Sequence, residues 1–140
     1  MRSVQILAAS MLVACGAEEP VVVHGDLQIV DEAELDGLAG VSEVTGHLEI
    51  SDTRAVAIFL PDLERVGDLT VHANRALLDL DLPALRRVEG DVAILYNNQP
   101  LATDATATLT CSAQALFEAV GVGGDVLIYG NAGEAAVCGP

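Results

Sequence analysis

The amino-acid sequence predicts a mainly β fold: a right-handed parallel β-solenoid of about five coils with a short helix near its C-terminal end. Three observations predict it. A pentapeptide recurs five times, apolar residues spaced three apart precede four of the copies, and one position at a fixed distance after each copy is usually polar. The glycines that open the pentapeptides are 21, 21, 23 and 34 residues apart. One unit of this length cannot bury both of its faces, so we expect the units to stack and share a core.

Each pentapeptide alternates apolar and variable residues after its glycine, which is the pattern of a strand with one buried face. The five copies begin at Gly25, Gly46, Gly67, Gly90 and Gly124. We expect their third residues to form one inward column, made of Leu27, Leu48, Leu69, Val92 and Val126. The fourth residues should form an outward column, made of Gln28, Glu49, Thr70, Ala93 and Leu127.

The apolar triplets predict short inward-packing turns or extended segments between the strands. They are Leu38, Val41, Val44; Leu60, Leu63, Val66; Leu82, Leu85, Val88; and Leu116, Ala119, Val122. Pro61 and Pro83 follow the first leucine of the two middle triplets and argue against long helices there.

A corner position lies seven residues after each pentapeptide glycine and is occupied by Glu32, Thr53, Asn74, Asn97 and Asn131. Asparagines stacked at one corner can hydrogen-bond the backbone of neighbouring coils and satisfy a buried turn. We therefore expect a structural ladder of Asn74, Asn97 and Asn131, with looser corners at Glu32 and Thr53.

The two ends of the solenoid differ. The 34-residue spacing holds a segment in which Ser112 is a candidate N-cap for two helical turns, with Leu116 and Val120 facing inward. We expect this helix, linked by a Cys111–Cys138 disulfide, to close the C-terminal end. The N-terminal end has no comparable cap, so we expect it to be covered by residues 32–35 or by another molecule, which leaves self-association through the first coil open.

The N-terminus predicts export. Arg2 followed by the apolar run 4–13 has the form of a secretory signal, and the run is too short to span a bilayer as a permanent helix. Residues Leu12 to Gly16 resemble the lipobox of bacterial lipoproteins, which implies cleavage after residue 14 and a diacylglycerol on Cys15. The alternative is an ordinary signal peptide in which Cys15 has no role.

The expected organisation is thus a signal at 1–14, a lipidated cysteine and tether at 15–20, and the solenoid at 21–140. Lipid on Cys15 would leave Cys111 and Cys138 as the remaining pair in an oxidising compartment; the alternative is two independent free thiols. The predicted location is the bacterial cell envelope, bound to a membrane through Cys15, with the periplasmic face and the cell surface both open.

The charge of the chain excludes nucleic acid as a partner. Removing the signal leaves five arginines, no lysine and 21 acidic residues, a net charge of −16. Such a field repels phosphate backbones and anionic headgroups, so membrane attachment would depend on the acyl chains.

The full repeat pattern resembles that of a known family. The pattern Leu-x-x-Leu-x-x-Val-x-Gly-Asp-Leu-x-Ile followed by a corner Asn is similar to the receptor L-domain type of leucine-rich repeat, and its best copies are residues 60–74 and 82–97. The resemblance covers about residues 21–131. It implies a β-helical module of the kind found in receptor ectodomains and fungal cell-wall proteins.

Candidate chemistry is sparse. The repeat aspartates Asp68, Asp91 and Asp125 should stack about 4.8 Å apart, either as solvated turn residues or as weak calcium ligands. His24, His47 and His72 do not share one repeat position and show no zinc spacing, and no hydrolase serine motif occurs.

The sequence therefore favours a non-catalytic binding or surface-structural module for a protein or glycan, with no catalytic residues and no cofactor. The alternative is a calcium-dependent or carbohydrate-active enzyme on the same scaffold. The outward column favours the binding module, because it becomes apolar toward the C-terminus, as a contact surface would.

Overall fold

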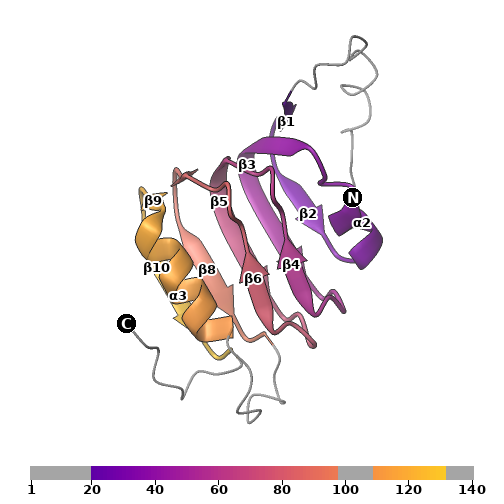
Figure 1. Cartoon of the computed structure of the whole chain (residues 1–140), viewed down its shortest axis with the longest axis vertical. Helices are drawn as coiled ribbons and strands as arrows, with labels where there is room; N and C mark the ends of the chain where they lie inside the picture. Colours follow the sequence, from indigo (N-terminus) through magenta and orange to yellow (C-terminus); the bar gives the residue numbers. More distant parts are fainter. Residues whose placement is uncertain (1–19, 98–108, 132–140) are drawn as a thin grey trace.

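The computed structural model describes residues 20–97 and 109–131. Within them the chain is mainly β, a parallel β-solenoid of about three turns with a short C-terminal helix (Figure 1). Five coils and a right-handed winding stay predictions. The elements in chain order are β1 (Val21–Val23), β2 (Leu27–Ile29), α2 (Glu32–Asp36), β3 (Val41–Ser51), β4 (Ala57–Phe59), β5 (Arg65–His72), β6 (Asp79–Asp81), β7 (Arg87–Val88), β8 (Val92–Leu95), α3 (Leu109–Ala119), β9 (Gly121–Val122) and β10 (Val126–Tyr129).

The five pentapeptides pair side by side as predicted. Strands β2, β3, β5, β8 and β10 are parallel neighbours in one sheet, and the register matches equivalent repeat positions. The third residues align in the order Leu27, Leu48, Leu69, Val92 and Val126. The fourth residues align in the same way, so both predicted columns exist.

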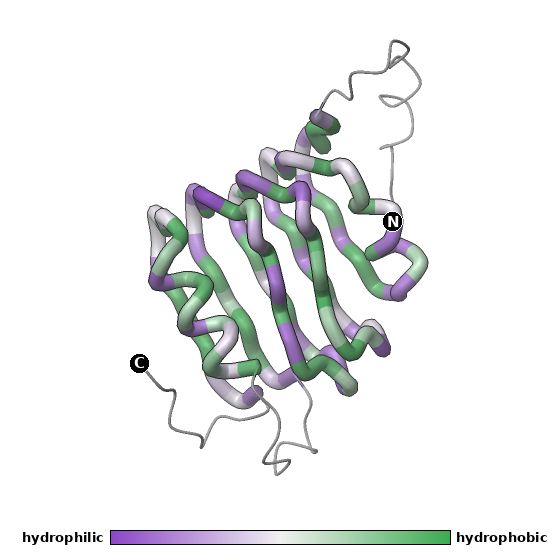
Figure 2. The backbone as a smooth tube through the Cα atoms, in the orientation of Figure 1, coloured by the Kyte–Doolittle hydropathy of each residue, from purple (hydrophilic) through white to green (hydrophobic). Residues whose placement is uncertain are grey.

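The core is aliphatic and lies inside these strands. Leu48, Val71 and Ile94 are fully or almost fully buried, and Phe117 is the aromatic member of the core among the described residues. Hydrophobic positions recur at equivalent places from strand to strand along the tube in Figure 2. Val126 departs from the prediction because it is 39% exposed. It belongs to β10, which has β8 as its strand partner in the described part of the chain.

Three of the four apolar triplets are buried as predicted, and their last residues continue the sheet through β3, β5 and β7. Pro61 and Pro83 lie in turns, which confirms the absence of long helices there. The fourth triplet was read wrongly. Leu116 and Ala119 belong to α3, and Ala119 is exposed because helical geometry turns it away from the core.

The C-terminal helix is longer than predicted. It begins by Leu109, so Ser112 lies within the helix and is not its N-cap. Its buried face is built on Leu109, Ala113 and Phe117, which are four residues apart; Val120, just after the helix, is buried as predicted, and Leu116 packs only partly against the core. The helix lies at the β10 end of the stack and contacts β6, β9 and β10 (Figure 1).

The N-terminal end carries a second short helix. The Asp31 side chain accepts a hydrogen bond from the Glu34 amide at 2.9 Å, and the Glu34 side chain accepts one from the Val30 amide at 2.8 Å. These two bonds cap the start of α2; they differ from a standard capping box because Glu34 accepts from Val30, the residue before the N-cap Asp31. Leu35 packs against the core, so part of the segment expected to cover the first coil does so. None of the helices in the described ranges is long and apolar enough to cross a membrane.

Candidate functional site

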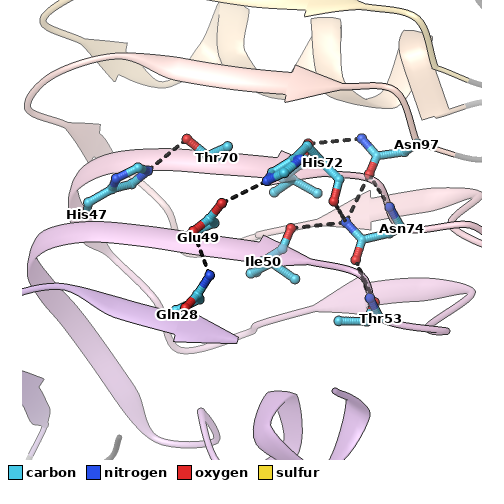
Figure 3. Close-up of polar contacts among 10 residues, drawn as sticks. Gln28, His47, Glu49, Ile50, Thr53, Thr70, His72, Asn74 and Asn97 are labelled. Carbon is cyan, nitrogen blue, oxygen red and sulfur yellow. Dashed lines mark hydrogen bonds and ion pairs between the residues drawn. The ribbon is translucent and has the colours of Figure 1, made fainter. Parts of the chain in front are cut away.

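The corner ladder is the most regular polar feature of the molecule (Figure 3). The Oδ1 atom of Asn97 accepts the backbone N–H of Asn74 at 3.1 Å, and Oδ1 of Asn131 accepts that of Asn97 at 3.0 Å. Each side-chain amide also donates to the preceding coil, to the carbonyls of Ile50, Val71 and Ile94 in turn. All three asparagines are completely buried, and the predicted ladder is confirmed.

The ladder extends one coil further than predicted. Both the amide and the hydroxyl of Thr53 donate to Oδ1 of Asn74, at 3.0 and 2.7 Å. Thr53 is 2% exposed, so the expectation of a loose corner there was wrong. Glu32, in contrast, is exposed and belongs to α2, so the first corner lies outside the ladder.

A second corner feature was missed by sequence reasoning. The residue immediately before each ladder residue has a left-handed backbone: φ is +58° at Asp52, +59° at Ala73, +57° at Tyr96 and +73° at Gly130. The conformation turns the chain so that the next side chain points inward. Only Gly130 carried a signal, because glycine alone adopts this conformation without steric cost.

The Gly-Asp step forms a third line of contacts between coils. The Oδ1 atoms of Asp26, Asp68 and Asp91 accept the backbone N–H of the equivalent residue in the next coil, at 2.8, 2.8 and 2.9 Å. A Cβ atom placed on Gly90 would overlap Oδ1 of Asp68, and one on Gly124 would overlap that of Asp91. Glycine is therefore required at Gly90 and Gly124, and likewise at Gly46 beside Asp26, because the aspartate of the coil before occupies the space; at Gly67 the backbone carbonyl of Gly46 occupies it instead.

This geometry bears on the calcium candidates. The Oδ1 atoms of Asp68 and Asp91 are engaged by backbone amides, and all three aspartates are partly or fully exposed to solvent. Within the described ranges, no group of three or more His, Cys, Asp or Glu side chains is placed to hold a metal ion. Asp68 and Asp91 thus act as structural acceptors between coils.

The outer face of the main sheet is polar over its N-terminal strands (Figure 3). Glu49 accepts from Nε2 of Gln28 at 3.0 Å, and its other oxygen lies 2.7 Å from Nε2 of His72. Nε2 of His47 lies 2.8 Å from the hydroxyl of Thr70. His47 and His72 are therefore half-buried surface residues bound to polar neighbours, while His24 is exposed.

The same face is apolar over β8 and β10. Leu127 is 50% exposed and pairs with Ala93, while Tyr129 is 41% exposed and pairs with Leu95. Tyr96 follows β8 and is 50% exposed; its ring lies edge-on to that of Tyr129, with centroids 5.4 Å apart. Exposed leucine and tyrosine side chains grouped in this way are typical of contact surfaces. We call Leu127, Tyr129 and Tyr96 the aromatic face.

Of the predicted cysteines, the structure describes one. Cys111 lies in α3, and Cys138 and Cys15 lie outside the described residues, so lipidation and the disulfide stay predictions. Comparisons with protein-family models, curated proteins and solved structures found no match to this chain.

Proposed function

We propose that the chain is a lipid-anchored protein of the bacterial cell envelope whose solenoid binds a protein or glycan without catalysing a reaction. The observation that carries the proposal is the aromatic face. Three large side chains, each between two-fifths and one-half exposed, lie together at the end of the outer sheet face away from the polar contacts of Gln28, Glu49 and His72.

The chemistry of the aromatic face suits recognition. Tyrosine offers a flat apolar ring together with a hydroxyl that can hydrogen-bond, and it gives a large contact area at a low cost in side-chain entropy. Neighbouring Ala93 and Leu95 add apolar surface without charge. Sugar rings and apolar protein side chains both pack well on such a surface.

The scaffold is suited to hold the aromatic face rigid. The corner ladder ends at Asn131, two residues after Tyr129, and Asn131 donates to the carbonyl of Tyr129 at 3.1 Å. The in-register pentapeptides and corner asparagines support the finer interpretation as a receptor L-domain-like repeat of five right-handed coils. The membrane anchor is supported by the Leu12 to Gly16 sequence alone.

The test of the binding proposal uses the protein's own fluorescence. The chain has two tyrosines and no tryptophan, and both tyrosines belong to the aromatic face, so intrinsic emission reports on this surface. We expect a saturable emission change on titration with a soluble peptidoglycan digest or a purified envelope protein, and its loss in Leu127→Glu. Gln28→Glu, at the polar end of the same outward column, is the matched control. A response equal in both variants, or release of new reducing ends from the glycan, would contradict the proposal.

The anchor needs its own experiment. Mass spectrometry of the membrane fraction should find a diacylglyceryl group on Cys15 and a chain that begins there. Cys15→Ser should move the protein out of the membrane fraction. An unmodified Cys15 in membrane-associated protein would overturn the anchor while leaving the binding proposal intact.

A further inference from the structure

Residues of α2 and β4 line a groove. Both elements lie at the end of the molecule opposite β10 (Figure 1). The groove encloses about 500 Å³ and is lined by one side of α2 and by residues 55–59. This volume is within the range of pockets that bind ligands. The groove shares no residue with the aromatic face.

The groove exists because one strand of the second sheet is missing. This sheet consists of β4 and β6, paired in parallel with Ile58 opposite Leu80. Adjacent coils at this end are offset by 21 residues, so the equivalent segment one coil earlier is 36–38. There the chain ends α2 at Asp36 and turns, so among the described residues β4 has β6 as its one strand neighbour.

The open edge of β4 presents backbone groups to the groove. The carbonyl of Val56 accepts the Leu78 amide at 2.7 Å, and the amide of Leu60 donates to the Asp81 carbonyl at 3.1 Å, both on the β6 side. Successive residues of a strand direct their N–H and C=O groups to opposite neighbours. The peptide groups of Ala57 and Phe59 therefore face away from β6, toward α2, as an edge ready to pair.

The side chains of the groove combine apolar surface with negative charge. Val56 is 56% exposed and Phe59 58% exposed, and the apolar side chain of Leu35 lies across from them on α2. The charged residues of the lining are both acidic, Glu32 and Asp36. Within the described residues, neither carboxylate takes part in an ion pair or hydrogen bond, and α2 has no basic residue in its last turn.

We propose that this groove binds an extended segment of a partner protein that carries alternating apolar and basic residues, which adds to β4 as a third parallel or antiparallel strand. Backbone pairing with β4 gives the affinity, and the apolar side chains of the segment pack on Val56 and Phe59. Its lysine or arginine side chains reach Glu32 and Asp36 on the opposite wall, and the net charge of −15 speeds the approach of a basic segment. This site is separate from the surface of the proposed function.

The test is a titration of the full-length chain with a labelled six-residue peptide that alternates lysine and valine, followed by fluorescence anisotropy. We expect saturable binding that weakens with salt. A peptide with the same side chains but N-methylated backbone amides cannot pair with a strand, and it should bind at least tenfold more weakly. A peptide in which glutamate replaces each lysine should also bind at least tenfold more weakly.

Variants locate the binding. The double substitution Glu32→Gln and Asp36→Asn should lower the affinity for the lysine peptide by roughly five- to tenfold, because two partly exposed charge pairs are lost. Glu118→Gln, which removes one exposed carboxylate on α3 at the other end of the molecule, should leave the affinity for the lysine peptide unchanged. Phe59→Lys should abolish binding, and its urea denaturation curve establishes that the exposed substitution leaves the fold intact.

Three results would overturn the proposal. Equal affinity of the N-methylated peptide would show that binding is electrostatic and needs no strand edge. A change in tyrosine emission on peptide binding would place the peptide on the aromatic face, which would leave the proposed function standing. Concentration-dependent dimers that dissociate in Phe59→Lys would assign the groove to a second copy of this chain.

Discussion

Replacing Asn97 by alanine should be among the most damaging single changes in the molecule. Its side chain makes four hydrogen bonds: Oδ1 accepts the amide and Nδ2 of Asn74, and Nδ2 donates to the Val71 carbonyl and to Oδ1 of Asn131. After the change, Nδ2 of Asn74 still donates to two backbone carbonyls, and Oδ1 of Asn131 still accepts the backbone N–H of residue 97. The Asn74 amide and the Val71 carbonyl lose these Asn97 partners in a fully buried corner.

The expected loss follows from these contacts. The buried Asn74 amide, left without its acceptor, costs about 1–3 kcal/mol, and the lost side-chain bonds to the Val71 carbonyl and to Asn131 add about 0.5–1.5 kcal/mol each, so Asn97→Ala should lower the free energy of unfolding by about 2–6 kcal/mol. Single domains of this size have only about 5–15 kcal/mol in total. The variant should therefore be partly unfolded in mild urea.

Urea denaturation followed by far-UV circular dichroism measures this loss. Gln28→Ala is the control, because it removes one exposed side-chain hydrogen bond, to Glu49, and should change the free energy of unfolding by less than about 0.5 kcal/mol. A loss for Asn97→Ala no larger than that of the control would refute the idea that the ladder holds the coils together.

Three further predictions concern the coil contacts and the C-terminal cysteines. Gly90→Ala should cost about 1–3 kcal/mol of unfolding free energy because its Cβ overlaps Oδ1 of Asp68, and the cost should shrink in an Asp68→Ala background; strictly additive losses in urea would contradict the contact. Ala73→Gly should raise the free energy of unfolding by about 0.5–1 kcal/mol, because the steric strain of alanine in a left-handed conformation is larger than the extra backbone entropy that glycine loses on folding. A lower free energy of unfolding would contradict the corner geometry. Non-reducing peptide mapping should join Cys111 to Cys138, with reduction costing roughly 3–4 kcal/mol; alkylation of both as free thiols would rule the bridge out.

Most of the solenoid could be predicted because its signals are local and repeated. The alternation after each glycine marks a strand, and the constant spacing between copies sets the register, so Leu48 could be placed opposite Leu69 before any coordinates. Corner asparagines were recognisable because one residue type recurs at one position. Thr53 was placed at the corner position but was expected to be loose, because a threonine does not match that type; its hydroxyl and amide serve the same ladder.

The remaining features depend on contacts that no single segment encodes. Asp52, Ala73 and Tyr96 share a left-handed conformation but no side-chain chemistry, so nothing in the sequence links them. The groove beside β4 arises because α2 replaces a strand in the neighbouring coil, which only the assembled stack reveals. The start of α3 was misplaced because Ser112 offered a plausible cap, whereas burial of Leu109 and Ala113 extends the helix toward the N-terminus.

The central claim is that equivalent repeat positions stack in parallel and in register, and the distances between backbone protons test it most directly. Solution NMR of the isotope-labelled chain should give interstrand contacts between the amide and Hα protons of neighbours around Ile50, Val71 and Ile94, in the pattern of parallel strands. Strong Hα–Hα contacts typical of antiparallel pairing, or a register displaced by one residue at Val71, would contradict the stack and the surfaces derived from it.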